Sequence, residues 1–115
     1  MFPGKSITLK ESAHVGHGAV IHGANLGKNC LIASHSGIAG CVIVGDDVTI
    51  WGQVGITSGV TIGEKAIISA KAGVSKSLDG HKSYFGIPAD DFRSKYKEIA
   101  SIRKIPEILE KLKEK

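Results

Sequence analysis

Leu, Ile and Val recur at every sixth position between residues 26 and 74. The nine members of this series are Leu26, Ile32, Ile38, Val44, Ile50, Ile56, Ile62, Ile68 and Val74. Four positions after each member stands a small or apolar residue, such as Cys30, Val48 or Ala66. Between these two positions glycine recurs with polar residues after it, as in Gly45-Asp46-Asp47. A period of six fits neither a helix nor a simple strand. It fits a short strand that ends in a turn, repeated along the chain.

Three such sides close one triangular coil of 18 residues, with the branched residues pointing inward. Residues 7–78 are therefore expected to form about four coils of a hexapeptide-repeat β-helix. The phase slips upstream, because Ile21 and Leu26 are five positions apart rather than six. The slip predicts a local distortion, which either lies beside a functional site or belongs to an imperfect terminal coil.

The pattern changes after Leu78, where a polar turn and Gly86-Ile87-Pro88 end the repeat. This divides the chain into a β-helix domain, residues 1–80, and a C-terminal helical extension, residues 81–115. Asp90 is a candidate N-cap of a first helix, although Pro88 could also lead that helix from an earlier cap, and Pro106 is expected in the first turn of a second helix. Each helix has an apolar stripe, formed by Phe92, Tyr96, Ile99 and Ile102 in the first and by Ile105, Ile108, Leu109 and Leu112 in the second. Both stripes need a packing partner, either the β-helix or a neighbouring subunit.

The composition agrees with one small, layered domain. The chain of 115 residues has 15 Gly and only six Phe, Trp and Tyr residues, and Trp51 is the only one of these six between residues 3 and 83. Stacked identical layers leave no room for rings at inward positions. Four coils alone would leave two open ends and a small core, so we expect a homotrimer, with a monomer capped by its own helices as the alternative.

The sequence also excludes several classes of protein. No apolar run approaches the roughly 20 residues of a membrane span, and Met1–Lys5 do not resemble a signal peptide, so we expect a cytoplasmic protein without an integral membrane segment. Cys30 and Cys41 form no CxxC motif. The net charge is +4, and residues 81–115 hold nine Lys and Arg against six Asp and Glu. The alternating signs of these charges argue against nucleic-acid binding. Two interpretations of the segment stay open: a solvated helix surface, or a docking surface for an acidic protein.

His22 and Gly40 are the candidate catalytic residues. They are 18 positions apart, so they should stack on adjacent coils if the register survives the slip. A histidine can act as a general base near neutral pH, and the glycine N–H could face an oxyanion. Together they suit attack of an amine or hydroxyl on an activated acyl group. The alternative is a surface histidine beside a turn glycine.

A second pattern, Gly-His-x-x-x-x-His-Gly, contains His17 and His22. The two imidazoles could hold zinc if a third came from His14 or His35 of a neighbouring subunit. Two-histidine motifs are weak evidence of a metal site, so we assign no metal ligand and no bound cofactor.

Several segments together resemble a known family. HGANLGKNCLIASHSGIAG (residues 22–40), WGQVGIT (51–57), Ala72–Ser77, Gly86–Ala89 and Ile105–Leu109 are similar to the left-handed β-helix acyltransferases of lipid A biosynthesis, above all the UDP-3-O-(3-hydroxyacyl)glucosamine N-acyltransferases. The resemblance covers residues 13–112 and corresponds to the C-terminal part of these enzymes. It implies an all-β solenoid, a left-handed parallel β-helix with C-terminal α-helices.

The resemblance also implies a reaction. A hydroxyacyl group would move from the phosphopantetheine thioester of acyl carrier protein to the amine of a UDP-amino sugar. His22 would be the general base, Gly40 would stand at the oxyanion position, and the basic helices would meet acyl carrier protein.

Four features depart from the family. Its N-terminal uridine-binding domain and further coils have no counterpart in these 115 residues, and Gly23 replaces a polar residue. The family's second histidine would fall near Ser58, so that role is unfilled in this chain. Two alternatives therefore stay open: a zinc enzyme similar to γ-class carbonic anhydrases, which residues 15–31 resemble, and a non-catalytic trimeric β-helix.

Overall fold

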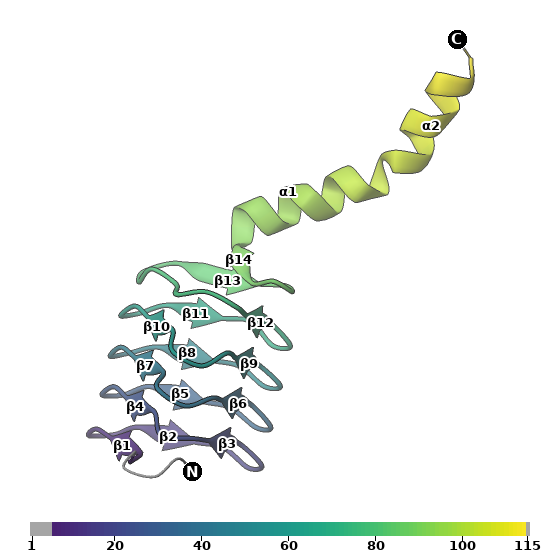
Figure 1. Cartoon of the computed structure of the whole chain (residues 1–115). Coiled ribbons are helices and arrows are strands. Elements are labelled where there is room, and N and C mark those ends of the chain that lie inside the picture. The colour runs from purple at the N-terminus through teal and green to yellow at the C-terminus, as the bar shows by residue number, and fades with distance from the viewer. Residues whose placement is uncertain (1–5, 115) are drawn as a thin grey trace.

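The computed structural model describes residues 6–114; Met1–Lys5, where we expect no signal peptide, lie outside the described residues. The chain winds into four coils stacked as a triangular prism, and two helices leave the prism at its C-terminal end (Figure 1). Each coil gives one two-residue strand to each of three sheets, and these strands pair in parallel. The predicted fold class, a parallel β-helix of about four coils with C-terminal helices, is confirmed.

The three sheets are the three faces of the prism. The first face consists of β1 (Thr8–Leu9), β4 (Asn25–Leu26), β7 (Ile43–Val44) and β10 (Thr61–Ile62). The second face consists of β2 (His14–Val15), β5 (Leu31–Ile32), β8 (Thr49–Ile50), β11 (Ile67–Ile68), β13 (Ser83–Phe85) and β14 (Asp90–Asp91). The third face consists of β3 (Val20–Ile21), β6 (Gly37–Ile38), β9 (Gly55–Ile56) and β12 (Gly73–Val74). Stacked turns form corner 1 after the first face, corner 2 after the second and corner 3 after the third.

The core is the column of side chains inside the prism. From β4 to β12 the second residue of each strand is buried in this column, and these residues are the nine members of the six-residue series. Branched aliphatic side chains suit this position because they are compact at Cβ and pack well on a pleated surface. Smaller residues such as Val48 and Val54 fill the space near the corners, where both are almost fully buried. The predicted inward series is therefore correct.

Glycine at corner 1 allows the coils to stack closely. A Cβ added to Gly45 would lie 2.8 Å from the backbone nitrogen of Glu64 in the next coil. No side chain fits at that distance from backbone atoms that cannot move aside. The recurrent glycine of the sequence pattern is thus a packing requirement of the stacked turns.

The register contains the expected slip. From the second coil onward partners are 18 residues apart, as Leu31 and Thr49 are, but Val20 of the first coil pairs with Gly37, 17 residues on. The cause is at corner 3, where the first coil turns with three residues, 22–24, and the second coil with four, 39–42. The first coil is therefore one residue short.

The C-terminal end of the prism is closed by two strands that the sequence analysis did not predict. β13 adds to β11 in parallel, and β14 returns antiparallel to β13. Tyr84 of β13 is 4% exposed, and its hydroxyl donates a hydrogen bond of 2.8 Å to the carbonyl of Asp79. An aromatic ring fits at this level because no further coil stacks on it.

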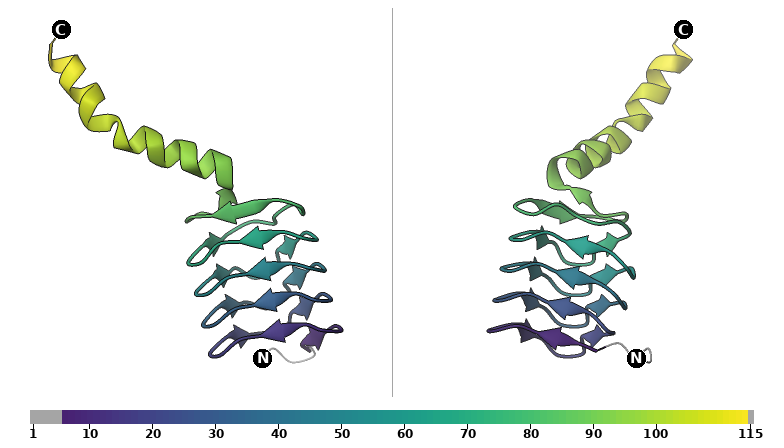
Figure 2. Two further views of the ribbon diagram at one scale, coloured as in Figure 1. Left: turned by 180° about the vertical axis from the view of Figure 1, so that it is seen from behind. Right: turned by 60° about the vertical axis from the view of Figure 1, so that its left-hand side comes forward.

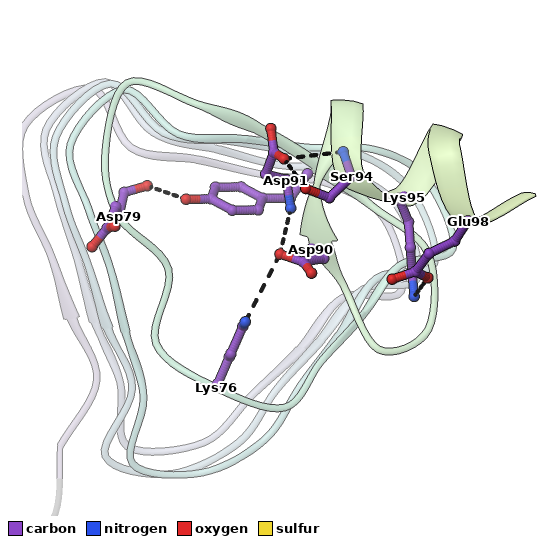
Figure 3. A network of polar contacts seen from close by, with 8 residues as sticks. Lys76, Asp79, Asp90, Asp91, Ser94, Lys95 and Glu98 are labelled. Carbon is purple, nitrogen blue, oxygen red and sulfur yellow. Dashed lines mark hydrogen bonds and ion pairs between the residues drawn. The ribbon is translucent and has the colours of Figure 1, made fainter.

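Two helices follow, α1 (Phe92–Arg103) and α2 (Ile105–Lys113). The N-cap of α1 is Asp91, whose carboxylate accepts hydrogen bonds from the Ser94 backbone N–H (3.1 Å) and hydroxyl (2.7 Å) (Figure 3). The prediction of Asp90 was wrong by one residue. Asp90 belongs to β14, and its carboxylate accepts from the Asp91 N–H and pairs with Lys76 at 3.8 Å. Pro106 lies in the first turn of α2, as predicted.

Neither helix has a buried residue. Both project away from the prism in every view, and α1 extends over the side where the strands of the third face lie (Figures 1 and 2). The apolar stripes of the two helices consequently remain exposed in the single chain. No helix among residues 6–114 has the length and apolar character needed to cross a membrane.

Candidate acyl-transfer site

His22 lies at corner 3 of the first coil, directly after β3. His22 is exposed, and its backbone N–H donates a hydrogen bond of 2.9 Å to the carbonyl of Ile38 in the second coil. This backbone bond fixes the position of the residue while leaving the imidazole accessible. A general base needs such access to the proton it removes.

Gly40 lies at the same corner in the second coil and is buried. Within residues 6–114 no hydrogen bond from the Gly40 N–H is formed. A backbone N–H without a partner at the corner that carries His22 is a candidate donor for an anion.

The two residues lie at the same corner on adjacent coils but not directly one above the other, because the 18-residue register on which direct stacking depended does not survive the slip. The Cys41 N–H donates to the carbonyl of Gly23 at 3.1 Å, which continues the 17-residue register through the corner. Gly40 therefore lies over Gly23, and His22 lies level with Ala39. The short turn at residues 22–24 is the physical reason, because it removes one position from the first coil.

Corner 3 presents small and hydroxyl-bearing residues above these two. The Gly59 N–H donates to the Gly40 carbonyl at 3.1 Å, so the third coil returns to the 18-residue register and Ser58 lies over Gly40. Thr57 and Ser58 are exposed. The family resemblance implies a second histidine near this position. The residue here is Ser58, which is exposed at the same corner.

The other histidines lie elsewhere. His17 and His35 occupy corner 2 on adjacent coils, joined by a 2.9 Å hydrogen bond from the His35 N–H to the His17 carbonyl, and the His35 ring lies against Gly18. His14 is on the second face. The strand β3 separates His17 from His22, so the paired motif occupies two different corners. In the described part of the chain, no three His, Cys, Asp or Glu side chains are placed to hold a metal ion.

The two cysteines differ in environment. Cys30 is a core residue at 1% exposure, and burial raises the pKa of its thiol above the ordinary value. A buried thiol that resists ionisation is a packing group rather than a nucleophile. Cys41 is exposed at corner 3, next to Gly40.

The sequence analysis did not anticipate a groove beneath α1. It has a volume of about 560 Å³, and its walls include Ser69 and Ala70 of corner 2, Phe85 of β13, and Phe92, Tyr96 and Arg103 of α1. The ring centroids of Phe85 and Phe92 are 4.7 Å apart. The only sequence signal was the return of aromatic residues after position 83, where the coils end.

Comparison with known proteins gives the fold a class. No family model matches the chain. An N-acyltransferase from Bacillus cereus, AntD, in complex with dTDP-4-amino-4,6-dideoxyglucose and coenzyme A, superposes with a TM-score of 0.71 at 18% identity, covering 88% of this chain and 73% of that one. The protein is therefore a hexapeptide-repeat β-helix of the kind found in acyltransferases.

Sequence comparison is more specific. The chain is 43% identical over 67 residues to the UDP-3-O-acylglucosamine N-acyltransferase of Campylobacter lari, covering 58% of this chain and 21% of the relative. It is 38% identical over 81 residues to the enzyme of that name from Caulobacter sp. K31, covering 70% of this chain and 24% of the relative. The predicted resemblance to this family is confirmed. The chain spans about a quarter of the length of these relatives.

Proposed function

We propose that the chain is an acyl-transfer module of the lipid A pathway type. It would move a hydroxyacyl group from acyl carrier protein to the amine of a UDP-amino sugar. The observation that carries this proposal is the 38–43% identity to UDP-3-O-acylglucosamine N-acyltransferases over 67 to 81 residues.

In the proposed reaction His22 removes a proton from the sugar amine as its nitrogen attacks the thioester carbonyl. The carbonyl oxygen becomes negatively charged in the tetrahedral intermediate. The free N–H of Gly40 donates a hydrogen bond to this oxyanion. When the intermediate collapses, the carbon–sulfur bond breaks and the thiolate takes the proton held by His22. The products are the amide and the free phosphopantetheine thiol.

The donor in this proposal is the phosphopantetheine thioester of acyl carrier protein, and the chain itself holds no cofactor. Residues 81–115 carry nine Lys and Arg against six Asp and Glu, so they favour an acidic carrier. The exposed basic residues of α1 include Arg93, Lys97 and Arg103. We further propose a homotrimer in the cytoplasm.

The test is a transfer assay with the purified chain, acyl carrier protein loaded with a 3-hydroxyacyl group, and a UDP-amino sugar. Mass spectrometry should detect an acylated sugar and an equal amount of free carrier thiol. Carrier and UDP-amino sugar are also titrated separately against the chain. Absence of product together with absence of binding to both would overturn the proposal in favour of a non-catalytic β-helix.

A further inference from the structure

Lys95, in the first turn of α1, is largely covered although it carries a charge. Its side chain is 12% exposed, whereas the Glu98 side chain, about one turn further along the helix, is 55% exposed. The Lys95 ammonium donates a hydrogen bond of 3.1 Å to the Glu98 carboxylate (Figure 3). Lysine side chains mostly extend into water, so the low exposure of Lys95 indicates a specific contact along its stem.

The surface that covers Lys95 is the backbone of Gly86. A Cβ built on Gly86 would lie 2.6 Å from Cε of Lys95 and 2.9 Å from its Cγ, so the aliphatic stem of the lysine lies directly over the glycine. Gly86 also has a φ of +96°, a conformation that residues with a side chain rarely adopt. Both the backbone and the stem of Lys95 therefore require glycine at this position.

Gly86 is itself fixed to the prism. Its carbonyl accepts a hydrogen bond of 3.0 Å from the Gly73 N–H of β12, and the Ala89 N–H donates one of 2.8 Å to the Gly73 carbonyl. Two bonds thus hold residues 86–89 to the fourth coil. The stem of Lys95 consequently rests on a segment that moves with the prism, and this contact ties α1 to the prism.

The other contacts of α1 with the prism gather at its first residues. The helix packs against β13 and β14, the ring of Phe92 lies 4.7 Å from that of Phe85, and Asp91 caps the first turn. These contacts determine where α1 begins. Further along, the helix borders the open groove. Lys95 is therefore the residue whose contact can fix the direction of the helix.

We infer that Lys95 is a positioning residue, whose stem over Gly86 sets the direction in which α1 leaves the prism. The inference rests on the proposed function, in which the basic α1 binds acyl carrier protein. The carrier holds its thioester on an arm of fixed length, so the direction of α1 determines whether the acyl carbon reaches His22. Lysine suits this role because its four-carbon stem packs as an apolar group while its ammonium stays at the surface.

The direction of α1 can be measured without reference to catalysis. In a Cys41→Ser background, spin labels are attached at Thr61→Cys on the first face and Ser101→Cys on α1, both exposed positions, and labelled chains are diluted with unlabelled ones. Double electron–electron resonance then gives the distance between the labels within one chain. With Lys95 in place this distance should have a narrow distribution.

Three variants of the labelled protein test the contact. Lys95→Ala removes the stem, so the distance distribution should broaden or shift. Lys95→Met keeps an apolar stem of similar length and should restore the narrow distribution. Glu98→Gln removes the charge of the partner and leaves the stem in place, so it is the matched control and should also remain narrow. Identical distributions in Lys95→Ala and Lys95→Met, with both proteins folded by circular dichroism, would overturn the inference.

Acyl transfer separates positioning from a general loss of structure. With loaded acyl carrier protein, Lys95→Ala should lower kcat at least about tenfold, because the thioester is misplaced, while the dissociation constant of the carrier stays unchanged. With an acyl-pantetheine donor, which has no carrier to dock on α1, the variant should match the wild type. An equal loss with both donors would assign Lys95 a merely structural role and overturn the inference. A wild type that transfers from neither donor would contradict the proposed function, and the label distances would still decide whether Lys95 sets the direction of α1.

Discussion

The Cys41 N–H donates a 3.1 Å hydrogen bond to the carbonyl of Gly23, and this contact determines how corner 3 is built. It places Gly40 over Gly23 and brings His22 level with Ala39. The coils of a β-helix lie about 4.8 Å apart, so His22 and the Gly40 N–H occupy adjacent levels of one corner, offset by one residue. A base and an oxyanion donor act on different atoms of the tetrahedral intermediate, so direct stacking of the two residues is not required.

The Gly40 N–H can be tested by removing the donor alone. Gly40→Pro takes away an N–H that bonds to nothing within residues 6–114, so no bond of the fold is lost. The rate of acyl transfer should fall by a factor of about 10² to 10³, the usual effect of losing one oxyanion donor. Gly40→Ala keeps the N–H and serves as the control. Equal rates in the two variants, with both folded by circular dichroism, would remove Gly40 from the mechanism.

Ser36 is a buried serine in a core that is otherwise mostly aliphatic. Its hydroxyl donates to the Trp51 carbonyl at 2.9 Å and accepts from the Val54 N–H at 3.3 Å. Ser36→Ala leaves both backbone groups without this partner, so the free energy of unfolding should fall by about 1–3 kcal/mol. Urea denaturation measures the loss. Ser34→Ala, at an exposed serine nearby, should change stability by less than about 0.5 kcal/mol.

The N-cap of α1 predicts a dependence on pH. Hydrogen bonds from the Ser94 side chain and backbone N–H lower the pKa of Asp91 below its ordinary value. The folded helix therefore binds this proton more weakly than the unfolded chain does. The stabilisation is present above about pH 4, the unfolded value, and is lost as the pH falls through the folded pKa.

Circular dichroism at 222 nm between pH 2 and pH 6 follows this loss. Asp91→Asn keeps a side-chain oxygen for the cap but cannot titrate. The helical signal of the wild type should decline more steeply below pH 4 than that of the variant. Superimposable curves would show that Asp91 does not couple to helix stability.

The sequence predicted much of the fold because the fold is local and periodic. The six-residue series from Leu26 to Val74 specified the inward residues, and the five-residue step from Ile21 to Leu26 revealed the slip. The N-cap was missed because Asp90 and Asp91 are adjacent and both suit a cap. The choice depends on pairing of Asp90 opposite Phe85, which is a tertiary contact.

The candidate site was only partly predictable for the same reason. The spacing of His22 and Gly40 placed both residues at one corner. Their offset by one residue follows from the shortened turn at residues 22–24, and the spacing does not show how this turn pairs with the next coil. The groove beneath α1 joins Ala70 to Tyr96, residues of a turn and a helix that share no sequence period. Such surfaces depend on how separate elements meet.

The role of His22 is the central claim, and transfer by single variants tests it most directly. His22→Ala and His17→Ala are compared with the wild type, using acyl carrier protein loaded with a 3-hydroxyacyl group and a UDP-amino sugar, with molecular mass checked for each protein. His17 lies on the same coil at a different corner and controls for loss of an exposed imidazole. We predict that His22→Ala abolishes transfer at unchanged mass while His17→Ala retains it. A His22→Ala variant that transfers the acyl group at the wild-type rate would contradict the account.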